Sequence, residues 1–209
     1  MSLESKIYKI ADKLLISEKQ QDLLERYYEK IKEHNFSTYE HCARVALKGV
    51  EVAESLEWGI NAGRALYYGG LLHDLGKINI DRRILDKKDF DSEDMDKIKP
   101  HVMDGYIMLK EDFPFSALIC LKHHSYQVNG YPKIINPDFL NSKIKTNKLD
   151  KFSKTIALLD YNDAINHRKN NKSDIHADRK KVMQKMHDNY RDVTMSKMIN
   201  LFYMMVQLM

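Results

Sequence analysis

The chain has 209 residues, of which 43% are hydrophobic and 31% charged, and a formal net charge of +4 at pH 7. These values exclude a disordered or fibrous chain and suit one globular domain, alone or with a short helical extension. Glycine and proline number only 8 and 4, which favours helices. No alternating run of β-branched residues predicts a strand, so we expect an all-α fold.

Features that would place the protein outside the cytoplasm are missing from the sequence. The two cysteines, Cys42 and Cys120, lie on apolar helix faces, which is typical of buried free thiols in a reducing compartment. The N-terminus has no apolar core of a signal peptide, and the apolar stretch 198–205 is too short to span a bilayer. Basic residues in 143–154 alternate with Asn, Thr and Leu, as in a solvated loop. We therefore expect a cytoplasmic protein that binds neither membrane nor long nucleic acid.

Two helices are predicted at the N-terminus, over residues 2–15 and 17–33. Both are strongly charged on one side, as the helices of an outer hairpin would be. We interpret residues 1–34 as a helical extension that packs on a main domain formed by residues 35–209.

The next two predicted helices carry the first candidate site residues. Apolar residues recur at helical spacing over residues 38–57, and His41 borders their stripe. The following helix, 61–74, ends in the adjacent pair His73 and Asp74. Serine or threonine often begins a helix, so two capping boxes are predicted upstream. One pairs Ser17 with Gln20. Ser37 and Thr38 are both candidate N-caps of the next helix, and Glu40 would complete the second box with Ser37.

A polar loop over residues 77–91 precedes a helix that begins at Asp91 or Ser92 and that Pro100 should kink, just before His101. A short apolar helix, 115–124, then ends in a histidine pair. The remaining predicted segments are an irregular stretch at 133–150, a helix at 151–168 with Asp160 on its core side, a polar loop at 169–175, and helices at 177–190 and 193–208.

Seven imidazole or carboxylate side chains recur on these apolar helix faces. A buried ionised carboxylate persists only when it is paired or bound to a metal, and a lone buried histidine is more often a hydrogen-bonded core residue than a ligand. A purely structural role would have to hold separately for all seven residues, and that combination is improbable. We therefore predict a metal site. The candidate ligands are His41, His73, Asp74, His101, His123, His124 and Asp160.

The order His, His-Asp, His, His-His, Asp resembles the HD-domain metal-dependent phosphohydrolases. It is most similar to their HD-GYP subgroup, the cyclic di-GMP phosphodiesterases, and the similarity spans about residues 36–170. The segments that carry it are Glu40 to Val45, Leu71 to Ile78, Ile84 to Lys87, Pro100 to Gly105, His123-His124, Gly130-Tyr131-Pro132, and Asp160 with Asp163, Ala164 and Arg168. The resemblance implies an all-α helical bundle whose metal ligands project into its centre.

By this resemblance, two divalent metal ions share the site. His41, His73, Asp74 and Asp160 would hold the first ion, and Asp74 would bridge to a second. The second ion would also be held by His101, His123 and His124. Nitrogen and oxygen ligands suit Fe, Mn, Ni, Co or Zn. Lys77 would contact a substrate phosphate.

The sequence departs from the subgroup around its glycine-tyrosine-proline motif. Ser125 follows the histidine pair where the subgroup has an acidic residue, and the loop to Gly130 is one residue short. Ser37 stands where a third metal would need a carboxylate, so two metals are predicted. Arg168 is a second candidate phosphate ligand that could instead pair with Asp163. Tyr131 could stack on a base or simply pack.

The sequence therefore predicts hydrolysis of a phosphodiester, with a cyclic dinucleotide as the best single candidate, or of a nucleotide phosphate. The substrate would be a small phosphorylated molecule attacked by a metal-bound hydroxide. Two alternatives share the ligand pattern. One is a di-iron oxygenase of the HD type, and the other is a non-catalytic nucleotide sensor.

Overall fold

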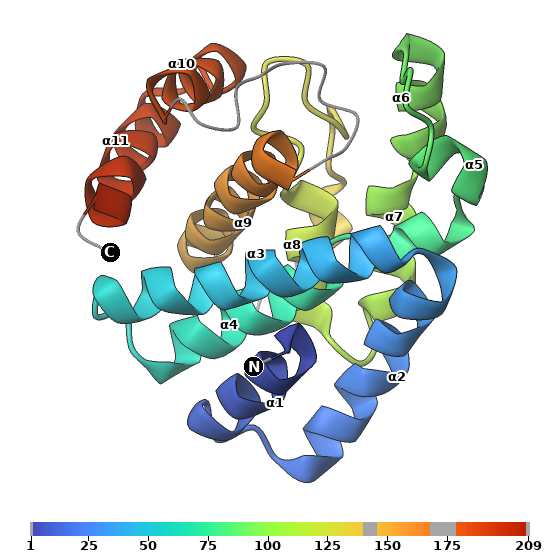
Figure 1. Cartoon of the computed structure of the whole chain (residues 1–209), viewed down its shortest axis with the longest axis vertical. Helices are drawn as coiled ribbons and strands as arrows, with labels where there is room; N and C mark the ends of the chain where they lie inside the picture. The colour runs from blue at the N-terminus through green and yellow to red at the C-terminus, as the bar shows by residue number, and fades with distance from the viewer. Residues whose placement is uncertain (1, 140–145, 168–178, 208–209) are drawn as a thin grey trace.

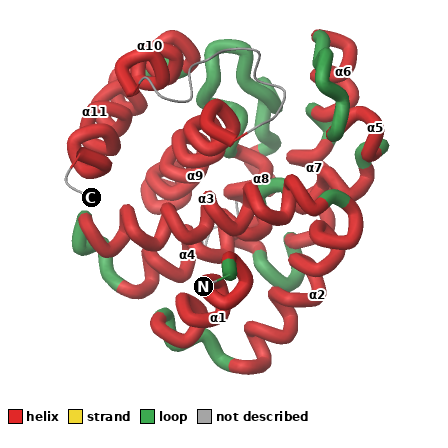
Figure 2. Tube along the Cα trace, viewed as in Figure 1, coloured by secondary structure: helices red, strands yellow, loops and turns green. Residues whose placement is uncertain are grey.

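The computed structural model of the chain describes residues 2–139, 146–167 and 179–207. Within these ranges it contains helices joined by loops and no strand, which confirms the all-α prediction (Figure 1, Figure 2). The helices, in chain order, are α1 (Leu3–Lys13), α2 (Glu18–His34), α3 (Phe36–Ser55), α4 (Ile60–Leu72), η1 (Leu75–Asn79), α5 (Arg82–Leu85), α6 (Ser92–Ile98), α7 (His101–Leu109), α8 (Pro114–Lys122), η2 (Pro137–Phe139), α9 (Thr146–His167), α10 (Arg179–Asn189) and α11 (Val193–Gln207).

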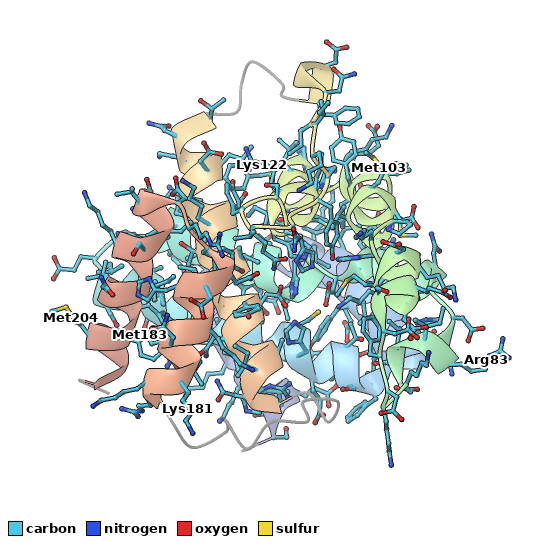
Figure 3. All side chains as sticks on the ribbon, turned by 90° about the horizontal axis from the view of Figure 1, so that it is seen from above. Arg83, Met103, Lys122, Lys181, Met183 and Met204 are labelled. Atoms are coloured by element: carbon cyan, nitrogen blue, oxygen red, sulfur yellow. The ribbon has the colours of Figure 1, made fainter. Side chains whose placement is uncertain are left out.

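Three helices, α3, α4 and α9, pack against one another in the middle of the molecule (Figure 1). Val45, Leu66 and Ile156 lie in the apolar cluster that joins them, and each is almost completely buried. Helix α8 packs on α4 and α9, and α7 packs on α8 and η1. Side chains fill the space between the helices (Figure 3). Burial of these apolar faces holds the elements that carry the candidate ligands in fixed relative positions.

The N-terminal pair, α1 and α2, lies against α3 on the side away from α10 and α11 (Figure 1). Ile7 and Ile31 are buried in the same apolar cluster as Tyr67 of α4. The Tyr67 hydroxyl also donates a hydrogen bond to the Ile7 carbonyl at 3.1 Å. The proposed division of the chain into an extension of residues 1–34 and a domain of residues 35–209 stays a prediction.

Both predicted capping boxes are wrong, and at α3 the predicted N-cap is wrong as well. Asn35 caps α3, and its side-chain oxygen accepts the backbone N–H of Thr38 at 2.8 Å. Ser37 therefore lies inside the helix and forms no capping box with Glu40. At α2, Ser17 occupies the N-cap position, but its side chain makes no capping hydrogen bond and its hydroxyl donates to the Gln20 side chain at 3.2 Å.

The segment between Asp74 and His101 is more helical than predicted. Residues 77–91 include the end of η1 and the short helix α5, whose N-cap Asp81 accepts the backbone N–H of Arg83 at 2.8 Å. Asp91 begins α6 through a capping box with Asp94, as one of the two predicted starts required. The sequence pattern predicts one helix kinked at Pro100, but Pro100 separates two helices, α6 and α7.

The other predicted helices agree with the structure within two residues at their described ends, with one exception. Helix α9 begins at Thr146, five residues before the predicted start at Lys151, so 133–150 is irregular only in its first part. The predicted loop 169–175 lies outside the described residues. None of the described helices combines the length and apolar character needed to cross a bilayer.

Helices α3 and α4 approach closely at Gly70, whose position leaves no room for a Cβ atom beside the Ala46 backbone. We predict that Gly70→Ala lowers the free energy of unfolding by about 2 kcal/mol, because overpacked sites lose about 1–3 kcal/mol. Urea unfolding followed by circular dichroism measures the change.

Gly63→Ala on the same helix is the matched control. Its added methyl would meet only the flexible end of the Leu14 side chain, at 2.9 Å, and alanine favours a helix over glycine by about 1 kcal/mol. We expect this variant to be at least as stable as the wild type. Equal stability of the two variants would contradict the close packing of α3 on α4.

Candidate metal centre

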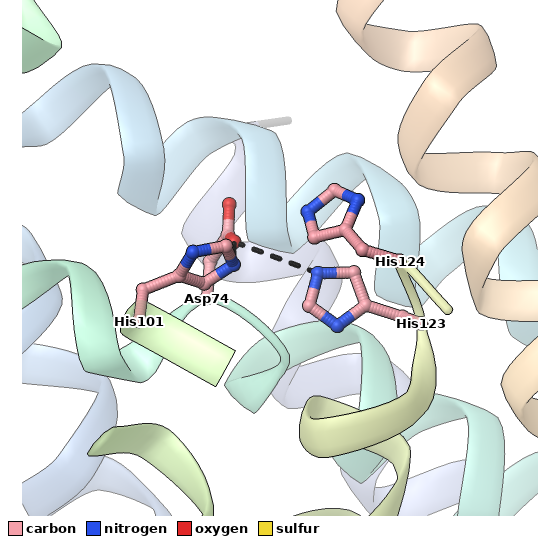
Figure 4. A group of neighbouring side chains, drawn as sticks. All are labelled: Asp74, His101, His123 and His124. Carbon is pink, nitrogen blue, oxygen red and sulfur yellow. Dashed lines mark ion pairs between the residues drawn. The ribbon is translucent and has the colours of Figure 1, made fainter. Parts of the chain in front are cut away.

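The structure brings all seven predicted ligands together from five separate parts of the chain. They come from α3 (His41), the two residues that follow α4 (His73 and Asp74), the start of α7 (His101), the two residues that follow α8 (His123 and His124), and α9 (Asp160). His73, Asp74, His101 and His123 have no solvent exposure. Four of the seven are seen converging in Figure 4.

Asp74 lies at the middle of the group, and its two carboxylate oxygens face different partners. Oδ2 lies 3.5 Å from His73 Nε2 and 3.7 Å from His41 Nε2. Oδ1 lies 3.3 Å from His101 Nε2 and 3.9 Å from His123 Nε2, the pair marked in Figure 4. The carboxylate therefore separates two sets of imidazoles.

Asp160 completes the set on the Oδ2 side of Asp74. Its Oδ1 lies 3.1 Å from His41 Nε2 and 3.9 Å from His73 Nε2. Its Oδ2 is 4.0 Å from His124 Nδ1, so Asp160 also faces the other set.

The backbone fixes the orientation of three imidazoles. His73 Nδ1 lies 2.8 Å from the Gly70 carbonyl, and His101 Nδ1 lies 2.8 Å from the Ile98 carbonyl. His123 Nδ1 lies 2.6 Å from the Cys120 carbonyl. A carbonyl accepts only a proton-bearing nitrogen, so in the neutral ring Nε2 keeps its lone pair and points to the centre.

The donor set fits metal ions. Among the described side chains, the buried atoms Asp74 Oδ1, His101 Nε2 and His123 Nε2 have no hydrogen-bond partner, which is costly for a polar atom away from water. Bonds of about 2.0–2.2 Å would place neighbouring ligand atoms about 3.0–3.6 Å apart, close to the spacing found here. Two groups meet at Asp74, one with His41 and His73 and the other with His101, His123 and His124.

At several of these ligands the protein environment favours the protonation state that metal binding needs, and His41 is the exception. Burial lowers the pKa of His73 and holds that of His123 at about 3, so both imidazoles are neutral. Burial alone would raise the pKa of Asp74, but the nearby Lys77 ammonium holds it well below its ordinary value. Burial also disfavours charge on His41, but hydrogen bonds to Asp160 and Asp163 outweigh it and raise the pKa. Ionised carboxylates thus face mostly neutral imidazoles.

Asp163 has a position that sequence reasoning did not assign. Its Oδ2 lies 2.7 Å from His41 Nδ1, and its two oxygens accept hydrogen bonds from the Arg44 guanidinium at 2.8 and 3.0 Å. Burial opposes its charge, yet His41 and Arg44 lower the pKa of Asp163 to about 2. The sequence held a usable signal, since Asp163 lies three residues after Asp160 and so shares its helix face. Asp163 thus pairs with Arg44, while the predicted alternative of a pair with Arg168 falls outside the described residues.

Two of the three predicted substrate-binding residues are described. The Lys77 ammonium contacts Asp74 Oδ2, and the side chain is buried. The Tyr131 ring stacks on His124, with centroids 4.7 Å apart and planes at 26°. Arg168 lies outside the described residues.

A cavity of about 260 Å³ opens beside the metal-competent group. Lys77, His101, His124 and Asp160 lie on its wall, so a ligand in the cavity would reach the centre. The remaining lining residues include the aromatic side chains of Phe90, Tyr131 and Tyr161.

We predict that the protein binds two divalent metal ions per chain and that each half of the site can be emptied separately. His101→Ala should lower the content to about one ion, and Asp74→Ala should abolish binding because the carboxylate serves both halves. Elemental analysis of protein loaded with Mn²⁺ or Zn²⁺ measures this. His187→Ala is the control, since its imidazole contacts Ser196 and Asn200, far along the chain from the candidate ligands. Full metal content in Asp74→Ala would refute the bridging role.

Asp163→Asn should weaken metal binding by about 10- to 100-fold, the usual effect of removing the partner that orients a histidine ligand. The substitution keeps the size of the side chain but removes the charge that His41 and Arg44 face. Competition with a chelator gives the affinity. Arg44→Met, which leaves Asp163 in contact with His41, should have a smaller effect; the reverse order of the two variants would be incompatible with the assigned role.

Comparison with models of protein families matches residues 38–165 to the HD domain. The matched region contains all seven candidate ligands. No curated protein matches the chain. Members of the matched family are generally metal-dependent hydrolases and bind divalent metals. Because the match covers more than half of the chain, the protein belongs to the HD-domain family.

Proposed function

We propose that the protein hydrolyses a phosphate ester of a nucleotide, and that its preferred bond is a phosphodiester. A cyclic dinucleotide such as cyclic di-GMP is the best single candidate substrate. One observation carries the proposal: the oxygens of Asp74 face two groups of imidazoles at one end of a cavity lined by Lys77. When bound there, two divalent ions would activate water at neutral pH and stabilise the negative charge of the phosphate.

Asp74 is the proposed catalytic carboxylate because both halves of the site depend on it. The two oxygens of Asp74 face different sets of imidazoles, so this one carboxylate fixes the distance between the two halves of the metal site. Complete burial keeps water from weakening these electrostatic interactions.

Lys77 is the proposed phosphate ligand. Its ammonium contacts Asp74 and also lies on the cavity wall, so it stands between the centre and the space for substrate. An ammonium carries three N–H donors and can bind a non-bridging phosphate oxygen. Burial of the side chain would strengthen this interaction compared with one at the surface.

Tyr131 supports the narrower assignment to the HD-GYP subgroup. It belongs to the Gly130-Tyr131-Pro132 motif, stacks on His124 and faces the cavity. An aromatic ring beside the centre is suited to contact a nucleobase. We propose that Tyr131 both packs on the histidine pair and binds the substrate.

The test is turnover of the metal-loaded protein on a panel of cyclic dinucleotides, mononucleotides and bis(4-nitrophenyl) phosphate. We predict hydrolysis of a phosphodiester, with no activity in Asp74→Ala. Lys77→Met should retain its metal and lose roughly 100-fold in kcat/KM, because a charge-assisted bond to phosphate is worth about 1.5–3 kcal/mol.

The same assay separates hydrolysis from the alternatives. Equal rates with and without dioxygen are expected for hydrolysis, whereas a di-iron oxygenase would require dioxygen. Nucleotide binding without turnover, in protein with full metal content, would instead identify a sensor. A Lys77→Met variant with wild-type kcat/KM would contradict the role of that lysine.

A further inference from the structure

Helix α10 lies outside the residues matched to the HD domain, yet it contributes to the wall of the cavity beside the metal centre. Lys185 is its contribution. The helix is held in place by Tyr190, whose hydroxyl donates to the Ala157 carbonyl of α9 at 2.7 Å. The Asn189 carbonyl also accepts the backbone N–H of Val128 at 2.9 Å. These contacts fix α10 against both α9 and the loop that follows the histidine pair.

Lys185 is partly buried and has no counter-ion among the described residues. Within the described ranges its ammonium makes neither an ion pair nor a hydrogen bond, and the acidic residue one turn further, Asp188, accepts from Gln184 instead. Lys181, one turn earlier on the same helix, is exposed at the edge of the molecule (Figure 3). A cation that is partly removed from water and lacks a partner favours binding of an anion.

The cavity as a whole is suited to a substrate with more than one negative charge. Among its described lining residues, Asp160 is the sole carboxylate, and it faces His41. The two lysines of the wall come from different elements. Lys77 in η1 contacts Asp74 at the centre, whereas Lys185 in α10 forms no ion pair with Asp74 or Asp160 within the part of the chain that is described. Two lysines from different elements, only one of which contacts Asp74, match two separate anionic groups.

Much of the remaining cavity wall is apolar or aromatic. Met95, Ile98, Tyr161 and Ile165 contribute to it, together with Phe90. Such a surface suits the sugar and base that connect two phosphates of a nucleotide, because ring faces pack well on apolar and aromatic side chains.

Resting on the function proposed above, we propose that Lys185 binds a second phosphate of the substrate, apart from the phosphate that reacts at the metal centre. The substrate class is then a nucleotide with two phosphate groups. Lys185 is a specificity-determining residue supplied by the C-terminal helices, and it takes no part in bond cleavage.

The experiment compares two probes, a linear guanine dinucleotide with a 5′-phosphate and the same dinucleotide without it. Steady-state kinetics of the metal-loaded full chain give kcat/KM for both. We expect the wild type to prefer the phosphorylated probe by about 10-fold or more, as expected for one charge-assisted hydrogen bond. Lys185→Met should lose this preference through a higher KM, with kcat on the unphosphorylated probe unchanged. Lys197→Met, which removes an exposed lysine of α11, should keep the preference.

Isothermal titration of the same proteins with both probes distinguishes failure of this inference from failure of the proposed hydrolysis. If the wild type binds the phosphorylated probe more tightly and Lys185→Met does not, the inference stands even without turnover. Equal affinity of the wild type for the two probes would overturn it. An undiminished preference in Lys185→Met would overturn it as well, whatever the rate of hydrolysis.

Discussion

The whole structure depends on one buried carboxylate, that of Asp74. Placing an ionised acid without solvent exposure is expensive, and the Lys77 ammonium in contact with Asp74 offsets part of that cost. Imidazoles lie on both sides of the carboxylate. Because backbone carbonyls orient His73, His101 and His123, each of these rings directs its Nε2 towards the centre. There His73 Nε2 lies 3.3 Å from His41 Nε2, and His101 Nε2 lies 3.3 Å from Asp74 Oδ1. The result is a site whose electrostatic compensation is complete only when cations join it.

The helices that surround Asp74 can supply these groups because two glycines let backbones approach closely. Gly70 permits contact between α3 and α4, which brings His41 towards His73. Gly76 lies against the His101 carbonyl and Gly105, so that η1 and the start of α7 touch immediately beside the carboxylate. A side chain at either position would move an element that carries a ligand. The close packing of the helices therefore also determines the geometry of the metal-competent group.

Much of this could be predicted from the sequence, since apolar periodicity reveals helices and metal-competent residues on apolar faces are conspicuous. The candidate ligands are few in kind and recur in order, so their convergence was foreseeable. Contacts between distant segments were not. The pairing of Asp163 with Arg44 and the arrival of Lys185 at the cavity depend on how α9 packs on α3 and α10 on α9, which helical spacing alone does not determine. The N-cap at Asn35 was missed because Ser37 and Thr38, two and three residues later, are also good caps.

The account is tested most directly by a crystal structure of the protein grown with Mn²⁺, using anomalous scattering to locate the ions. It predicts two anomalous peaks on opposite sides of the Asp74 carboxylate, about 3.5–4 Å apart, one beside His41 and the other beside His101. A single peak, or none within bonding distance of Asp74, would contradict the claim that this carboxylate bridges a pair of cations.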